Sequence, residues 1–216
     1  MDQPGKKIRP AYRFYQYLWL ALDWLFPPQC AGCGKIGKRL CTDCESKVQR
    51  LVPPLCPRCG RGQTTNAICL ECQQNPPQYV ACRSWGIFEG ALRECLHHLK
   101  YQNDISLGDT LARPLIQLLV DLNWEMDLVV PIPLSLDRLK ERGYNQASLL
   151  SRPSALALGL RFCPGALKKK KETPSQVGLT VLQRRENVRG VFQAVPEIVA
   201  GKKILLVDDV CTSGAT

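Results

Sequence analysis

Apolar positions near the start of the chain recur every three or four residues, which is the spacing of one face of an α-helix. The members of this stripe are Leu18, Ala21, Leu22 and Leu25. Pro27 and Pro28 follow directly and end such a helix. We therefore expect an N-terminal amphipathic helix within residues 1–28. Its stripe is short and Asp23 interrupts it, so we expect it to dock on the protein rather than on lipid.

The next zone, residues 29–76, has few large apolar side chains and is rich in Gly, Pro and Cys. Such a segment cannot bury enough surface to fold alone, so its stability has to come from bound metal. Asn75, Pro76 and Pro77 have the composition of a linker, since each proline favours extended backbone before it. The pattern thus predicts a small metal-stabilised module between two other parts of the chain.

From residue 77 to residue 216 the pattern alternates between strands and helices, which is typical of an α/β domain. The expected strands are Val80–Phe88, Leu128–Ile132, Val191–Val195 and Lys203–Val207. The expected helices are Ala91–Tyr101, Leu107–Leu122, one that starts near Asn145, and Leu179–Asn187. Pro153 lies inside the third of these helices and predicts a kink or a restart there. The lysine run Lys168–Lys171 predicts a solvated loop or hairpin.

The composition fits one ordinary domain with a small accessory module: 216 residues, of which 45% are hydrophobic. A formal net charge of +10 favours anionic partners. Basic residues precede the apolar run Tyr17–Phe26, but no small-residue cleavage site follows it, as a secretory signal requires. Ten helical residues rise only about 15 Å, against about 30 Å of hydrocarbon in a bilayer. We therefore expect a cytoplasmic protein without a membrane span.

Eight of the twelve cysteines form four CxxC pairs separated by seven, eleven and nine residues. Two such pairs supply the tetrahedral four-sulfur set that zinc prefers, and a filled set leaves no open position for catalysis. We expect two structural zinc ions. The simplest pairing is sequential, although a crossed pairing and an iron–sulfur cluster are alternatives. The sequential sets are Cys30, Cys33, Cys41 and Cys44, and Cys56, Cys59, Cys69 and Cys72.

Other metal-ligating residue types lack this spacing. Cys82, Cys95 and Cys163 have no cysteine partner at the CxxC spacing, and we expect them to be buried as small apolar side chains. His97 and His98 lie side by side in an expected helix. Two adjacent histidines are a weak ligand signal, so we interpret them as residues of the helix surface.

The last fourteen residues, KILLVDDVCTSGAT, begin with an apolar strand that delivers Asp208 and Asp209 to its carboxyl end. Ligands of open α/β sheets bind at that edge. Two neighbouring carboxylates suit the vicinal hydroxyls of a ribose or indirect contact with Mg²⁺. The small and hydroxyl-bearing residues that follow, Thr212, Ser213, Gly214, Ala215 and Thr216, offer backbone amides to a phosphate. The alternative interpretation is that Asp208 and Asp209 bind no ligand and are two solvated acids at the end of a strand.

The stretch VDDVCTSGAT resembles the PRPP-binding motif of type I phosphoribosyltransferases. Upstream, VVPIPL, RLKERGYNQA, TPSQVGL and RRENVRGVF occur in the order found in the ComF family of competence-associated proteins, which the chain resembles over nearly its whole length. The resemblance implies a type I phosphoribosyltransferase-like parallel sheet after a double zinc ribbon. It also implies PRPP with magnesium, bound by Asp208 and Asp209 at the ribose hydroxyls, Thr212–Thr216 at the 5′-phosphate and Arg142 at the diphosphate.

In two places the chain departs from the family pattern. Pro153 interrupts a helix that the family keeps whole, and the chain ends at Thr216, inside the phosphate motif. Family members continue with a helix whose N-terminus faces the phosphate. We therefore expect either a fragment or a truncated product, with weakened phosphate binding.

Two functions fit these observations. One is a PRPP-dependent phosphoribosyltransferase or PRPP sensor, linked to competence and DNA uptake, whose acceptor is unidentified. The alternative is a nucleic-acid-binding accessory factor in transformation, without transferase turnover, with single-stranded DNA or the competence machinery as partner. Its contacts would come from the zinc module and the basic residues Lys168–Lys171, Arg184, Arg185 and Arg189. In the first function the lysine run is a loop that closes over the site.

Overall fold

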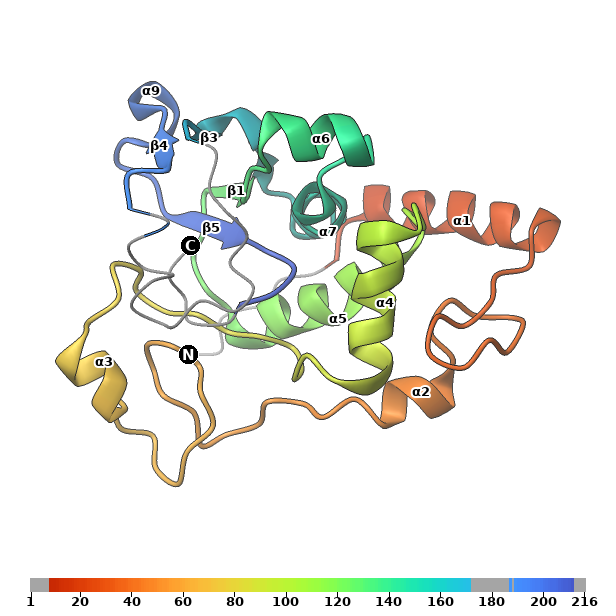
Figure 1. Ribbon diagram of the computed structural model, residues 1–216, viewed down its shortest axis with the longest axis horizontal. Coiled ribbons are helices and arrows are strands. Elements are labelled where there is room, and N and C mark those ends of the chain that lie inside the picture. The colour runs from red at the N-terminus through yellow and green to blue at the C-terminus, as the bar shows by residue number, and fades with distance from the viewer. Residues whose placement is uncertain (1–7, 172–186, 188, 212–216) are drawn as a thin grey trace.

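A three-stranded parallel sheet lies at the centre of the computed structural model, which describes residues 8–171, 187 and 189–211 (Figure 1). Its order is β2 (Arg161–Phe162), β1 (Leu128–Pro131) and β5 (Ile204–Val207). Leu128 pairs with both Arg161 and Ile204, so β1 is the middle strand. All four residues of β1 are buried, as expected for a central parallel strand. The predicted α/β architecture with a parallel sheet is confirmed.

Three helices pack around this sheet. Helix α7 (Gln146–Leu158) contacts β1 and α5 (Leu107–Leu122), and α5 in turn contacts α4 (Gly90–Tyr101). The short α6 (Leu136–Arg142) lies between β1 and α7 in the chain. The sequence-based bounds of α4 and α5 agree with the structure to within one residue. Residues such as Leu99, Leu107 and Val129 are completely buried where these elements meet.

The segment expected as the strand Val80–Phe88 is not a strand. Its residues have no regular secondary structure, and a single bridge joins Gly86 to Arg50. The backbone N–H groups of Cys82 and Ile87 instead donate to the carbonyls of Arg58 and Gln49, at 2.7 and 2.8 Å. Both acceptors belong to residues 29–76, which we call the cysteine segment. Backbone N–H groups that would bond to a neighbouring strand in a sheet therefore bond to loop carbonyls instead. The alternating side chains alone could not reveal this competition.

Helix α7 runs without interruption through Pro153, so the predicted restart does not occur. Proline costs a helix about 3 kcal/mol, because it removes a backbone N–H and crowds the preceding turn. Packing against α5 and β1 offsets that cost, since Leu150, Pro153 and Ala157 are all buried. The helix ends at Gly159, whose φ of 67° is the left-handed conformation that glycine adopts readily.

A two-stranded antiparallel ladder projects from the sheet. It pairs β3 (Leu167–Lys169) with β4 (Phe192–Ala194), after the 3₁₀ turn Pro164–Ala166 and before α9 (Pro196–Val199). The lysine run therefore begins in the first strand of a hairpin, in agreement with the predicted loop or hairpin. The expected helix Leu179–Asn187 lies almost entirely outside the described residues, as do Arg184 and Arg185.

The N-terminal helix α1 (Pro10–Leu25) is present, but it docks through a different face from the one expected. Leu18, Leu22 and Leu25 are 47 to 61% exposed. The docked face carries Tyr12, which is 2% exposed and packs with Ala112, Ile116 and Ala157. Tyr12 also donates from its hydroxyl to Asp109, 3.3 Å away. An aromatic ring with a polar end thus satisfies a buried carboxylate, which a leucine stripe could not do.

Further along α1, Asp23 holds the helix to the cysteine segment. The guanidinium of Arg39 donates two hydrogen bonds to this carboxylate, one of them 2.6 Å long. The same guanidinium lies 5.2 Å from the ring centre of Trp19. The acid that we expected to weaken the apolar stripe is therefore an anchor. None of the described helices is long and apolar enough to cross a membrane.

The cysteine segment runs along one side of the molecule, from α2 (Thr42–Ser46) to α3 (Leu70–Gln74), and these short helices lie at opposite ends of it (Figure 1). It has little regular structure beyond these helices and the isolated bridges Gln29–Ile36 and Leu55–Gly62. We therefore expect its order to depend on the cysteines, as the sparse apolar content of residues 29–76 predicts.

Candidate functional site

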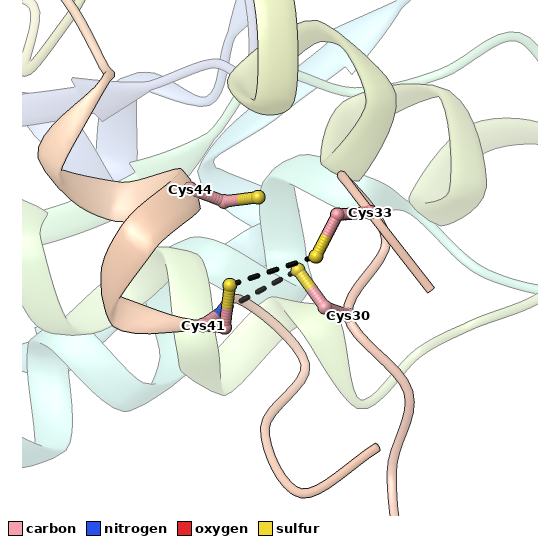
Figure 2. A group of neighbouring side chains, drawn as sticks. All are labelled: Cys30, Cys33, Cys41 and Cys44. Atoms are coloured by element: carbon pink, nitrogen blue, oxygen red, sulfur yellow. Dashed lines mark hydrogen bonds between the residues drawn. The ribbon is translucent and has the colours of Figure 1, made fainter. Parts of the chain in front are cut away.

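The eight paired cysteines form two groups in sequential order. In each group the four sulfur atoms lie within 4.8 Å of one another. Cys30, Cys33, Cys41 and Cys44 converge in this way from two loops and the start of α2 (Figure 2). Cys56, Cys59, Cys69 and Cys72 form the second group. The sequential pairing is therefore correct, and the crossed alternative is excluded.

The two groups are built alike. Each begins with a CxxC turn, in which Gly34 or Gly60 has a φ near 72° and donates its N–H to the carbonyl of the first cysteine. A short helix starts after the third cysteine, Cys41 or Cys69. The backbone N–H of that cysteine points at the first sulfur of the group, at 3.3 and 3.4 Å. This repeat of geometry follows from the repeat of spacing.

These sulfur sets suit zinc. Four thiolates around a small cavity are the donors of structural zinc sites. Burial opposes ionisation of Cys30, but backbone N–H groups, that of Cys41 foremost, lower its pKa to about 6. Cys56 in the second group behaves in the same way, with N–H groups led by that of Cys69 lowering its pKa to about 6. One ligand of each set is thus held ready as a thiolate.

The first zinc site belongs to the main core, whereas the second lies apart from it. Cys30, Cys41 and Cys44 share one hydrophobic cluster with Leu92 and Leu96 of α4. The second set is in none of the hydrophobic clusters of the described residues, although Cys56 is fully buried. Loss of the first metal should therefore disturb the α/β part of the protein more than loss of the second.

Two of the three remaining cysteines that we expected to be buried are buried. Cys95 is 0% and Cys163 7% exposed, whereas Cys82 is only partly buried. The sulfur of Cys82 lies 3.9 Å from that of Cys211, which is separated from the end of β5 by three residues. His97 and His98 lie on α4, and the ring of His97 packs 4.9 Å from Tyr101. Neither histidine belongs to a metal group among the described residues.

Asp208 and Asp209 lie at the carboxyl edge of the parallel sheet, directly after β5. Backbone pairing continues to Ile132, whose N–H donates to Val207 at 2.9 Å, so the ends of β1 and β5 meet at this edge. The N–H of Asp209 donates to Oδ1 of Asp208 at 2.9 Å. The expected placement of the acid pair is therefore found.

The two acids differ in their electrostatic surroundings. The ammonium of Lys100, in the last turn of α4, forms an ion pair with Oδ2 of Asp209, whose side chain is 5% exposed. Burial raises the pKa of Asp209, but Lys100, Asp208 and Gln146 together outweigh it and the net shift is downward. For Asp208, burial and then the neighbouring charge of Asp209 raise the pKa to about 7. The pair thus carries one firmly ionised carboxylate and one that titrates near neutrality.

Arg142 reaches the acid pair through Gln146. Its Nη1 donates to Oε1 of Gln146 at 2.5 Å, and Nε2 of Gln146 donates to Oδ1 of Asp209 at 3.4 Å. The guanidinium also lies 5.7 Å from the ring centre of Tyr101. Gln146 is 6% exposed, so its amide is held by these two partners rather than by water.

Every residue of the stretch Arg142–Gln146 has a structural role at this edge. Gly143 ends α6 with a φ of 80°. The hydroxyl of Tyr144 donates to the carbonyl of Leu99 in α4, at 2.5 Å. Asn145 accepts from the N–H of Ala147 to cap α7, and donates to the carbonyl of Ile132 after β1, both at 2.9 Å. The motif therefore joins α4, β1, α6 and α7 around Asp209.

Sequence reasoning named Asp208, Asp209 and Arg142 but missed Lys100 and Gln146. Gln146 belongs to the motif on which Arg142 was chosen, so that motif was a usable signal. Lys100 carried no signal beyond its place near the end of a helix. The expected phosphate-binding residues Thr212–Thr216 lie outside the described residues.

Comparison with known proteins agrees with this architecture. The double zinc ribbon domain family matches residues 21–73, which contain both cysteine sets. Competence protein F of Haemophilus influenzae is 30% identical over 196 residues, covering 87% of this chain and 85% of that protein. The chain belongs to the ComF family.

Other ComF-like relatives match a similar extent. Competence protein ComFC of Bacillus subtilis is 28% identical over 92% of this chain and 79% of that protein. The DNA utilization protein YhgH of Escherichia coli K12 is 28% identical over 82% of this chain and 80% of that protein. No solved structure matches the chain. The zinc ribbon match favours zinc over an iron–sulfur cluster in the two cysteine sets.

Proposed function

We propose that this ComF-family protein binds PRPP with magnesium at the carboxyl edge of β1 and β5. The observation that carries the proposal is the half-buried pair Asp208–Asp209, placed where β1 and β5 end and linked to Arg142 through Gln146. The ligand-binding part would be residues 77–216, with a type I phosphoribosyltransferase-like fold, after the helix of residues 1–28 and the zinc ribbon of residues 29–76.

The chemistry of these groups suits a phosphorylated ribose. Carboxylates accept hydrogen bonds, and two adjacent ones can take the two hydroxyls of a ribose. A guanidinium matches the oxygen pattern of a diphosphate. Magnesium would enter with the diphosphate and neutralise part of its charge. In a transferase reaction, Arg142 would stabilise the leaving diphosphate and the acids would hold the ribose in place.

Isothermal titration calorimetry with PRPP and Mg²⁺ tests this proposal. Asp209→Asn should weaken binding at least about tenfold, since an amide accepts at only one of its two terminal atoms. Asp121→Asn, on the exposed surface of α5, is the matched control and should bind like the wild type. Absence of PRPP binding by the wild type, or equal affinity in Asp209→Asn, would refute the proposal.

A second function, handling of single-stranded DNA in competence, is favoured by a different observation. Lys168, Lys170 and Lys171 are exposed on and just after β3. Relatives carry the names competence protein and DNA utilization protein. We propose that this basic hairpin contacts nucleic-acid phosphates and that the protein serves DNA uptake with or without transferase turnover.

Fluorescence anisotropy with a labelled oligonucleotide tests this second function. Changing Lys168, Lys170 and Lys171 to Gln should lower affinity and reduce the salt slope by about 2, because three phosphate contacts are lost. A matched control changes Lys140, Lys202 and Lys203, which are also exposed but lie outside the hairpin and the zinc ribbon. A flat salt response of the wild type, or equal losses in both triple variants, would argue against the hairpin.

Asp209→Asn separates the two functions. It should weaken PRPP binding and leave DNA affinity unchanged, because Asp209 is buried at the sheet edge while the lysines are exposed on a separate ladder. Equal loss of both affinities would mean that the two ligands share one site.

A further inference from the structure

Lys100 holds an unusual position for a lysine. Its side chain is 21% exposed and its ammonium pairs with Asp209, which is 5% exposed. Elsewhere the same kind of pair is ordinary: Lys203 and Glu125 are 64 and 77% exposed. Burying an ion pair costs solvation, and the charges are retained when both find good partners. The Lys100–Asp209 pair is therefore not a solvated surface pair of the kind that only keeps a protein soluble.

Asp209 is held by different partners at its two oxygens. Gln146 contacts Oδ1 and Lys100 contacts Oδ2. Arg142 binds the other end of the Gln146 amide and lies over the ring of Tyr101, the residue after Lys100. Lys100 of α4 thus contacts the carboxylate directly, whereas Arg142 of α6 is linked to it through Gln146. A ligand hydroxyl that donates to Oδ2 competes with the ammonium for the same oxygen and weakens the ion pair.

We propose that Lys100 is a second diphosphate-binding residue, which exchanges its partner when the ligand binds. The inference rests on the proposed binding of PRPP at this edge. In the free protein the ammonium neutralises Asp209. When ribose hydroxyls take the carboxylate, the ammonium moves to a diphosphate oxygen beside Arg142. The exchange is between two anions, so the lysine is never left buried without a counter-ion.

This exchange makes a prediction about ligand choice. A ligand with both a ribose and a diphosphate satisfies Asp209 and Lys100 together. Ribose 5-phosphate has no diphosphate at the C1 position. Its hydroxyls would displace Lys100 from Asp209 without supplying a new anion for the ammonium. Lys100 would then favour PRPP over ribose 5-phosphate by differential binding. The raised pKa of Asp208 agrees with this arrangement, since one cation serves two acids.

The test compares three ligands in calorimetry: PRPP with Mg²⁺, diphosphate with Mg²⁺, and ribose 5-phosphate. Lys100→Met should weaken PRPP and diphosphate about ten- to a hundredfold, as expected for loss of a charged hydrogen bond. It should leave ribose 5-phosphate unchanged or tighter. Lys203→Met removes an exposed pair and should bind all three like the wild type. Equal weakening of all three ligands by Lys100→Met would overturn the inference.

A double variant removes the risk that Lys100→Met misfolds by leaving Asp209 unpaired. In the background Asp209→Asn, the Lys100→Met change should still weaken diphosphate about tenfold, because the ammonium contacts the diphosphate directly. If the effect disappears in that background, Lys100 acts only through Asp209 and the inference is wrong. Wild-type protein that fails to bind PRPP refutes the proposed function itself, whereas wild-type binding with an unaffected Lys100→Met refutes only this inference.

Discussion

The side-chain nitrogen of Gln146 lies 3.4 Å from Oδ1 of Asp209, although the two residues are 63 positions apart. One is the first residue of α7 and the other follows β5. Since Gln146 also accepts from Arg142 at 2.5 Å, a single amide connects the cation and the acid that we assign to the two ends of the ligand. The geometry of the site therefore depends on how α7 is positioned on the sheet.

Replacing Gln146 with Leu should destabilise the protein by about 1–3 kcal/mol, because Arg142 and Asp209 each lose a hydrogen-bond partner in a buried place. Urea unfolding measures this change. Gln117→Leu is the matched control, since Gln117 donates to Asp121 at 2.8 Å on the exposed face of α5. It should change the stability by less than about 0.5 kcal/mol. Similar losses in both variants would contradict the role given to burial.

Asp208→Asn should make the protein more stable at pH 8, by about 1–3 kcal/mol. Burial and the charge of Asp209 raise the pKa of Asp208 to about 7, above the value of about 4 in an unfolded chain. The folded state therefore holds its proton more tightly, and stability falls as pH rises from about 4 to about 7. Asp208→Asn should not show this fall in stability. Unfolding free energies of the wild type and the variant, measured from pH 5 to pH 8, test the difference, and Asp121→Asn should retain the wild-type profile.

Metal analysis should find two zinc ions per chain in protein purified under reducing conditions, and one after Cys44→Ser or Cys72→Ser. The two variants should differ in stability. Cys44 shares a hydrophobic cluster with α4, so its loss should lower the melting temperature of the whole protein, by at least about 5 °C more than loss of Cys72. Zinc-free wild-type protein that keeps its melting temperature would contradict the structural role of the metal.

Tyr12→Phe should cost about 1–2 kcal/mol, because Asp109 keeps its contacts with Arg113 but loses the hydroxyl at 3.3 Å. Tyr12→Ala should cost about 3–5 kcal/mol, through the cavity left between α1, α5 and α7. Tyr17→Phe is the control on the same helix, since Tyr17 is 67% exposed and should be neutral. Thermal unfolding of the three variants checks the order. Equal effects of Tyr12→Phe and Tyr17→Phe would show that the docked face is wrongly assigned.

Local patterns were sufficient wherever a short stretch decides its own structure. Helices α4 and α5 follow from an apolar period of about 3.6, and β1 and β5 from short apolar runs. The spacing of CxxC pairs indicated two four-sulfur sets, and the apolar run before Asp208 placed the acids at a strand end. In each case the residues that carry the signal are neighbours in sequence.

Local patterns failed where a segment had two comparable choices of partner. Helix α1 has both a leucine stripe and an aromatic face, and Asp109 of α5 selects the face with the hydroxyl of Tyr12. Residues 80–88 alternate like a strand, yet Cys82 and Ile87 bond to the cysteine segment instead. Tertiary contacts outweigh local preferences of this size, since those preferences amount to only tenths of a kcal/mol per residue.

The amino-acid sequence by itself determined the α/β class, the metal-ligating cysteines and the acid pair at the end of β5, because each depends on residue types at short, regular spacing. Only the tertiary structure decided which cysteines share an ion, which face of α1 is buried, and that Lys100 and Gln146 meet at Asp209. Those contacts join elements far apart in the chain. Their formation depends on how α4, α7 and β5 pack around one core, and no local periodicity encodes that packing.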